Sequence, residues 1–132
     1  EPYVFGELVD LVEMPPSWGL DDFPPLEYVW GANGGPMTPS QVKELWQGEF
    51  DYMVENCPGG VYILTCHPQF IGRGARITML GELIEHMKAN DVKFERLRDV
   101  AVRFREENSL EAWAEANPHR TGAASRPPAT SS

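Results

Sequence analysis

The sequence has few of the residues from which disulfides and metal sites are built. It contains two cysteines, Cys57 and Cys66, and three histidines, no two of which share the spacing of a metal motif. The cysteines form no C-x-x-C motif, and a strand between them would hold them about 20 Å apart, which is too far for a disulfide. We therefore expect free thiols, a reducing cytoplasmic location and no metal site in this chain.

Long apolar runs and clusters of basic residues are absent as well. No run reaches the roughly 20 apolar residues of a membrane-spanning helix. The net charge of −9, from 11 basic and 20 acidic residues, argues against nucleic acid and anionic membranes as partners. The length of 132 residues suits one globular domain. Because the numbering begins at Glu1 without an initiator Met, we expect an amino terminus that was cut or processed.

What the chain does contain is an alternation of apolar runs and amphipathic segments. Strands are predicted over residues 8–14, 61–65 and 92–94, and helices over 39–56, 75–88, 97–107 and 110–116. Strands and helices in this order are typical of an α/β fold with a parallel sheet. An open sheet of only three strands is a poor environment for a strand as apolar as 61–65. The chain is therefore predicted to be part of something larger, or one half of an obligate assembly.

The most informative run, Val61 to Thr65, leads directly into His67. Its unbroken apolar character predicts a strand buried on both faces, and parallel α/β folds carry their chemistry at the carboxyl ends of strands. The imidazole of His67 titrates near neutrality and can transfer a proton there. The alternative is a histidine that only caps the next loop. Cys66 is expected to be a buried structural residue rather than a nucleophile paired with His67.

Several motifs resemble one protein family over roughly residues 5 to 107. They are Leu64-Thr65-Cys66-His67-Pro68-Gln69, Ile71-Gly72-Arg73 with Arg76, Leu83-Ile84-Glu85-His86-Met87, and the upstream stretches Glu13-Met14-Pro15, Ser17-Trp18 and Leu20-Asp21-Asp22-Phe23-Pro24. These motifs resemble the carboxyl-terminal part of the polysaccharide deacetylase (NodB-homology) family. The likeness is greatest to the branch with peptidoglycan deacetylase-like proteins, cyclic imide hydrolases and metal-independent allantoinases.

The resemblance implies an α/β fold that is a partial (β/α) barrel. Residues 1–116 would form the C-terminal half of a distorted NodB-type TIM-like barrel, and residues 117–132 a flexible tail. The family's first half carries its own Asp-Asp, His-x-x-x-His and Arg-containing motifs, and none of these is present here. Asp21-Asp22 belongs to the later stretch quoted above. The missing N-terminal half, which would be a separate or nicked chain, is the partner implied. Any divalent, zinc-like metal would be held by that half. Homo-oligomers of the whole protein are implied as well.

For the site, the resemblance implies that His67 is a general acid, which protonates the leaving nitrogen of an amide. Asp21 and Asp22 would orient and charge-stabilise this histidine, with Asp22 preferred. The alternative is that the two aspartates cap backbone amides of a loop.

Three further residues are candidates for substrate binding. Trp18 and Leu64 would line the pocket, although core packing explains either equally well. The guanidinium of Arg73 matches a substrate carboxylate or imide oxygen, and the alternative is an ion pair that fixes the loop. Arg76, at the start of the second helix, is predicted to be structural.

The resemblance implies a hydrolase of carbon–nitrogen bonds other than peptide bonds. The first hypothesis is N-deacetylation of a sugar or small amide, and the second is hydrolysis of a cyclic imide or ureide. A third hypothesis, from another class, is a non-catalytic chain of an obligate assembly. The two enzymatic hypotheses need a companion that supplies metal or base residues beside His67, and the third hypothesis needs none.

Overall fold

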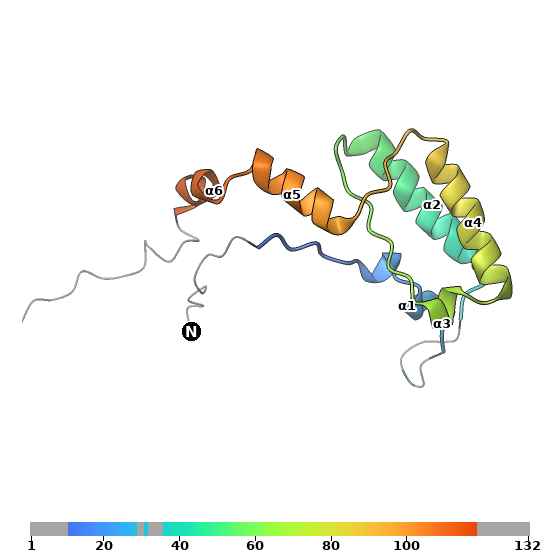
Figure 1. Cartoon of the computed structure of the whole chain (residues 1–132). Coiled ribbons are helices and arrows are strands. Elements are labelled where there is room, and N and C mark those ends of the chain that lie inside the picture. Colours follow the sequence, from blue (N-terminus) through green and yellow to red (C-terminus); the bar gives the residue numbers. More distant parts are fainter. Residues whose placement is uncertain (1–10, 29–30, 32–35, 119–132) are drawn as a thin grey trace, which may run out of the picture. The chain divides into compact units, whose positions relative to one another are not determined.

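The computed structural model describes residues 11–28, 31 and 36–118, which divide between two compact units (Figure 1). One unit is Pro15–Phe94, and the other combines the flanking segments Glu1–Met14 and Glu95–Ser132. The first unit contains η1 (Trp18–Leu20), α1 (Phe23–Leu26), α2 (Pro39–Asn56), α3 (Pro68–Ile71) and α4 (Gly74–Lys88). The second contains α5 (Leu97–Glu107) and α6 (Leu110–Ala116). Each unit is a separate body, and every candidate site residue belongs to Pro15–Phe94.

Helix α2 begins where the sequence predicts, because local hydrogen bonds fix its first turn. Thr38 is the N-cap, and its hydroxyl oxygen accepts from the Gln41 backbone N–H at 3.3 Å. The Gln41 side chain in turn accepts from the Thr38 N–H at 3.0 Å, which completes a capping box. Pro39 occupies the first position, where a missing N–H costs nothing. The predicted end of the helix at Asn56 is confirmed as well.

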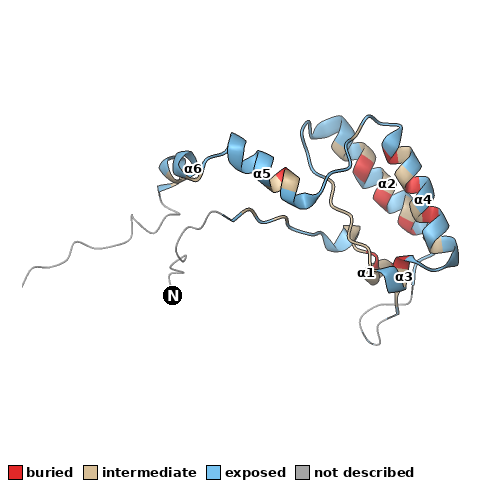
Figure 2. Cartoon of the chain, in the orientation of Figure 1, coloured by how far each residue is buried: buried red, intermediate tan, exposed pale blue. Residues whose placement is uncertain are grey.

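The core lies between α2 and α4, which run side by side (Figures 1 and 2). Helix α2 buries Val42, Trp46 and Phe50, and α4 buries Met79, Leu83 and Met87. These are i, i+4, i+8 rows, so each helix presents one ridge to the other.

The apolar row that the sequence spacing predicts for α4 is partly wrong. It consists of Ile77, Leu80, Ile84 and Met87, at i, i+3, i+7 and i+10. Only Met87 is buried, whereas Ile77 is 48% exposed and the other two are half-buried. The predicted row and the buried row lie on neighbouring stripes of the same helix, and the packing partner selects between them.

Residues 61–65 run extended but do not form the predicted strand. Within the described ranges, the pairing of Asp21 with Thr65 is an isolated parallel bridge, and no strand forms over residues 11–14 or 92–94. A strand needs a neighbour that pairs with its N–H and C=O groups. Residues 8–10 lie outside the described part. The partial barrel stays a prediction.

The last two helices have the predicted bounds. Ser109 is the N-cap of α6, and its side chain accepts from the Ala112 N–H at 3.2 Å. Val100 is the buried residue of α5. Residues 119–132 of the predicted tail, with His119, lie outside the described residues. None of the described helices combines the length and the apolar character that crossing a membrane requires.

Candidate functional site

The structure brings His67 and Asp22 into direct contact. Asp22 Oδ1 lies 2.6 Å from His67 Nδ1, and Asp22 Oδ2 accepts the His67 backbone N–H at 2.8 Å. Asp22 is fully buried, whereas the His67 side chain is 39% exposed. A carboxylate only accepts hydrogen bonds, so the Nδ1 hydrogen points to Asp22 and Nε2 is left for another partner. The pair is therefore a histidine oriented by a buried carboxylate, with one ring nitrogen available for chemistry.

A backbone bridge places the two side chains together. The Thr65 N–H donates to the Leu20 carbonyl at 2.8 Å, and the Asp22 N–H donates to the Thr65 carbonyl at 3.1 Å. Asp22 follows the bridged position on one segment, and His67 lies two residues beyond it on the other. The preference for Asp22 over Asp21 as the residue that holds His67 therefore agrees with the geometry.

Two short helices begin at the pair. Asp22 precedes α1 and His67 precedes α3, and the turn of α3 is closed by the Ile71 N–H, which donates to the His67 carbonyl at 3.0 Å. A Cβ at Gly72 would lie 2.4 Å from the Pro68 carbonyl oxygen, so only glycine fits where α3 ends. The loop after His67 is therefore a tight, backbone-defined turn.

An aromatic side chain covers one side of the imidazole. The ring of Phe70 meets His67 edge-to-face with centroids 5.5 Å apart, and it packs on Phe23 at 5.0 Å. Sequence reasoning missed Phe70 and Phe23. The available signal was that each aromatic follows one member of the pair within three residues.

The environment of His67 favours its protonated form. The hydrogen bond to Asp22 raises the pKa of His67 above its ordinary value of 6.5. Burial opposes this rise, and the negative charges of Asp22 and Asp21 add to it. The raised pKa extends the pH range over which the imidazole is protonated, and in that form Nε2 carries a proton that it can donate. This is what a general acid requires.

Replacing Asp22 with asparagine is expected to lower the pKa of His67 toward 6.5. An amide replaces one oxygen with NH₂ and removes the negative charge, so at least one hydrogen bond to His67 is lost. A histidine with a raised folded-state pKa stabilises the fold fully below its unfolded pKa, near 6.5, and this stabilisation disappears as pH rises through the raised value. The variant should lack that pH-dependent component. NMR titration of the imidazole and thermal unfolding against pH measure both effects.

Asp51→Asn is the matched control, because Asp51 faces the other described histidine. Asp51 Oδ1 lies 2.6 Å from His86 Nε2. This control should leave the pKa of His67 where it is in the unaltered chain. An unchanged His67 pKa in Asp22→Asn would contradict the hydrogen-bond assignment.

Asp21 caps a backbone amide, which is the alternative that the sequence left open for it. Its Oδ1 accepts the Phe23 N–H at 2.8 Å, and it lies 3.9 Å from His67 Nδ1. Possible ligand atoms of Asp21, Asp22 and His67 lie within 4.8 Å of one another. Both oxygens of Asp22 are already used by His67, and one oxygen of Asp21 is used by the backbone. These contacts are those of a proton-transfer pair, and the three residues are also close enough together to offer one ligand atom each to a cation.

The three predicted substrate-binding residues, Trp18, Leu64 and Arg73, have different surroundings in the structure. Trp18 is 78% exposed, so core packing does not explain it. Leu64 is half-buried and packs against the core cluster. Arg73 Nη1 lies 3.5 Å from Glu27 Oε1, which is the ion pair considered as its alternative. Pocket roles for these three remain predictions.

Cys66 and Cys57 are free thiols, as predicted. Burial, with the charges of Asp22 and Asp21, raises the pKa of Cys66 to about 11. A thiol with this pKa is protonated near neutrality, and the thiolate is the nucleophilic form. The preference for a structural Cys66 agrees with this environment.

A second histidine–aspartate pair joins the two long helices. The sequence position of His86 predicts a side chain on the solvent side of its helix, which is only partly so, because the side chain is 31% exposed. It bonds to Asp51 of α2 and meets the Phe50 ring with centroids 5.8 Å apart. The pair connects α4 to α2 and has a structural explanation.

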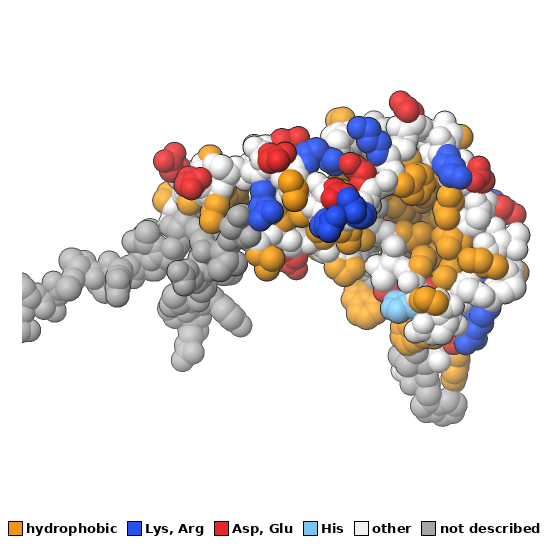
Figure 3. Space-filling view, viewed as in Figure 1, with side chains coloured by type: hydrophobic (Ala, Val, Ile, Leu, Met, Phe, Trp, Pro, Cys, Tyr) orange, Lys and Arg blue, Asp and Glu red, His pale blue; other side chains and the backbone are white. Residues whose placement is uncertain are grey.

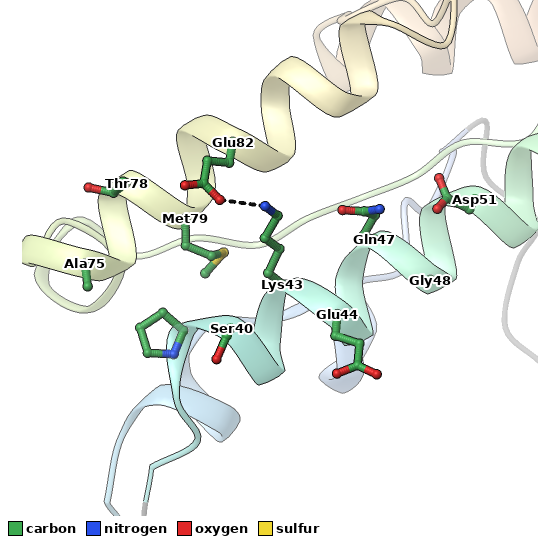
Figure 4. A pocket seen from close by; sticks show the side chains of 11 residues that line it. Ser40, Lys43, Glu44, Gln47, Gly48, Asp51, Ala75, Thr78, Met79 and Glu82 are labelled. Carbon is green, nitrogen blue, oxygen red and sulfur yellow. Dashed lines mark hydrogen bonds and ion pairs between the residues drawn. The ribbon is translucent and has the colours of Figure 1, made fainter.

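A groove of about 740 Å³ also lies between α2 and α4 (Figure 4). Lys43 of α2 and Glu82 of α4 form an ion pair across it, between two partly exposed side chains. Surface pairs of this kind contribute about 0–1 kcal/mol. His67 and Asp22 are not among the residues that line this groove. The groove follows from helix packing, and the histidine pair remains the candidate site.

A comparison with curated proteins supports the family resemblance. A protein named peptidoglycan deacetylase, from Helicobacter pylori, is 28% identical to this chain over 111 residues. The matched region is 82% of this chain and 38% of that protein, so the chain spans well under half the length of this relative. No family profile and no solved structure matches the chain. The similarity supports a relation to polysaccharide deacetylases and does not distinguish among their branches.

Proposed function

We propose that this chain is the part of a carbon–nitrogen hydrolase that supplies the general acid. The observation that carries the proposal is the buried Asp22 carboxylate, which holds His67 Nδ1 at 2.6 Å and leaves Nε2 to act. The similarity to a protein named peptidoglycan deacetylase supports this class of reaction. The first candidate substrate is an N-acetylated sugar or small amide.

In the proposed reaction His67 serves the leaving nitrogen. Water attacks the carbonyl carbon, the carbon–nitrogen bond breaks, and the Nε2 hydrogen passes to the nitrogen that departs. Asp22 keeps the ring in the orientation and tautomer that make this transfer efficient, as a carboxylate does in a catalytic triad. We place the base that activates water, and any divalent metal, in a companion segment.

The same acid suits the nitrogen of a cyclic imide or ureide. Nε2 donation requires only a leaving nitrogen, so the pair itself does not separate an open amide from a ring. We therefore propose imide or ureide hydrolysis as the alternative within the class. A non-catalytic chain of an obligate assembly is the proposal that remains if neither substrate is hydrolysed.

We also propose the missing N-terminal half as the partner of this chain. Among the described residues, the backbone of Val61 to Leu64 makes no backbone hydrogen bond, although the segment is apolar and extended. Figure 3 shows apolar side chains at the surface of the unit that holds α2 and α4, and Val61 is 47% exposed. An open edge of this kind pairs readily with another extended segment. A strand from the companion would satisfy these groups.

Native mass spectrometry of the purified protein, followed by two assays, tests the proposal. A bound companion polypeptide, or a longer chain that includes this sequence, is expected. The assays measure acetate release from an N-acetylated glycan and ring opening of a cyclic ureide. Acetate release supports deacetylation and ring opening supports the alternative. Hydrolysis of neither substrate by the assembled particle would overturn the enzymatic proposal and leave the interaction role.

A further inference from the structure

One guanidinium connects the two short helices that begin at the histidine pair. Arg76 Nη2 donates to the Leu26 carbonyl at 2.6 Å, and Nη1 donates to the Phe70 carbonyl at 3.0 Å. Nη1 also bonds to Glu27 Oε1 at 2.8 Å. The Arg76 side chain is only 18% exposed, so these bonds are shielded from much of the solvent. Its contacts therefore differ from those of a surface ion pair.

The positions of these contacts relate Arg76 to the pair. Asp22 lies immediately before α1, and Leu26 is the last residue of that helix. His67 lies immediately before α3, and Phe70 is in that helix. Arg76 thus holds the far ends of two single turns whose near ends carry Asp22 and His67. Short turns have little stability of their own, so their separation depends on such contacts.

The chemistry of arginine suits this task. A guanidinium carries five N–H donors in a rigid plane, so it binds two carbonyls and a carboxylate at fixed relative positions. Carbonyls near helix ends are among those without a partner inside the helix, and a cation there is favourable. A lysine has a single flexible ammonium and cannot reproduce the fork.

We propose that Arg76 is a positioning residue for the histidine pair, holding α1 and α3 at the separation at which Asp22 Oδ1 meets His67 Nδ1. Its effect on the pair concerns this chain alone, and its consequence for catalysis rests on the proposed function. Arg76 acts through Asp22 and His67 and touches neither side chain through any hydrogen bond described above. Its role goes beyond the structural one that sequence position predicts.

The first test is NMR titration of the His67 imidazole in Arg76→Met. Without the clamp, the Asp22 hydrogen bond lengthens or breaks, so the pKa of His67 is expected to fall toward 6.5. Loss of a nearby positive charge alone would raise the pKa of an imidazole. The direction in which the pKa of His67 changes therefore distinguishes the loss of positioning from the loss of a charge. Circular dichroism at the same temperature verifies that the variant is folded.

Arg76→Lys and Arg103→Met complete the set. Arg76→Lys keeps the charge but not the fork, so its His67 pKa should lie between those of the unaltered chain and Arg76→Met. Arg103→Met removes a two-bond pair with Glu95, at 2.8 and 2.9 Å, from the other unit. This control should leave the pKa of His67 unchanged. If Arg76→Met does not fold, the lysine variant and Glu27→Ala, which removes one guanidinium partner, decide the question.

A folded Arg76→Met or Arg76→Lys with an unchanged or raised His67 pKa would overturn the inference. In the assembled enzyme, kcat/KM of Arg76→Met should fall by up to about a hundredfold, the cost of a small misplacement, with a shifted pH profile. The two proposals fail separately. A lowered His67 pKa in a particle whose activity does not depend on His67 retains the positioning role and removes the catalytic one.

Discussion

Replacement of His67 with alanine is expected to lower kcat/KM for hydrolysis by the assembled enzyme about 10²- to 10⁴-fold. This is the range contributed by a positioned general acid. The fold should persist, since the His67 side chain is 39% exposed and lies outside the core cluster. Initial rates of acetate release or ring opening across pH measure the effect. The variant should also lose the high-pH decline in rate that deprotonation of an acid produces.

His86→Ala is the matched control for this prediction. It removes another histidine that bonds to an aspartate at 2.6 Å, but one that joins α4 to Asp51 of α2. We expect some loss of stability and no comparable loss of kcat/KM in this variant below its unfolding temperature. Equal activity of His67→Ala and the unaltered enzyme would remove His67 from the mechanism.

Replacement of Trp46 with alanine is expected to lower the free energy of unfolding by about 3–5 kcal/mol, the usual cost of truncating a buried aromatic. Trp46 is fully buried in the core cluster. Its Nε1–H donates to the Gly19 carbonyl at 2.9 Å, which fixes the segment just before Asp22. Natural domains are stable by only about 5–15 kcal/mol, so this loss is a large share. Denaturant unfolding followed by circular dichroism measures it.

Two variants bracket the Trp46 result. Trp46→Phe keeps an aromatic ring but loses the bond to Gly19, so it should cost less than the alanine variant. Trp113→Ala removes a tryptophan that is 39% exposed on α6 and should have a much smaller effect. A cost for Trp46→Ala no larger than that of Trp113→Ala would contradict the central place of Trp46 in the core.

Several elements could be predicted from the sequence because local interactions determine them. The capping box of Thr38 and Gln41 and the serine cap at Ser109 are formed by residues three positions apart. Such signals do not depend on what packs against the helix. The buried row of α4 was predicted less well, because Ile77 and Met79 are both apolar and the choice between their stripes belongs to α2.

The strand predicted over 61–65 also depends on a packing partner that the local sequence does not reveal. Its apolar residues indicate burial on two faces, but a strand exists only where a neighbour pairs with it. In the described part of the chain, that neighbour is Asp21 alone, opposite Thr65. The unpaired backbone of the preceding residues is consistent with a sheet that is completed by another segment, which stays a proposal.

The sequence by itself determined the four longer helices, the caps at Thr38 and Ser109 and the choice of His67 as a candidate site residue, since each depends on neighbours within a few positions. The short helices η1, α1 and α3 lie in segments predicted to be loops. Only the tertiary structure decided which aspartate holds that histidine. Asp21 and Asp22 are adjacent, and their partner lies 45 positions away from Asp22. The bridge at Thr65 selects Asp22, because long-range backbone pairing sets the register of one segment against the other.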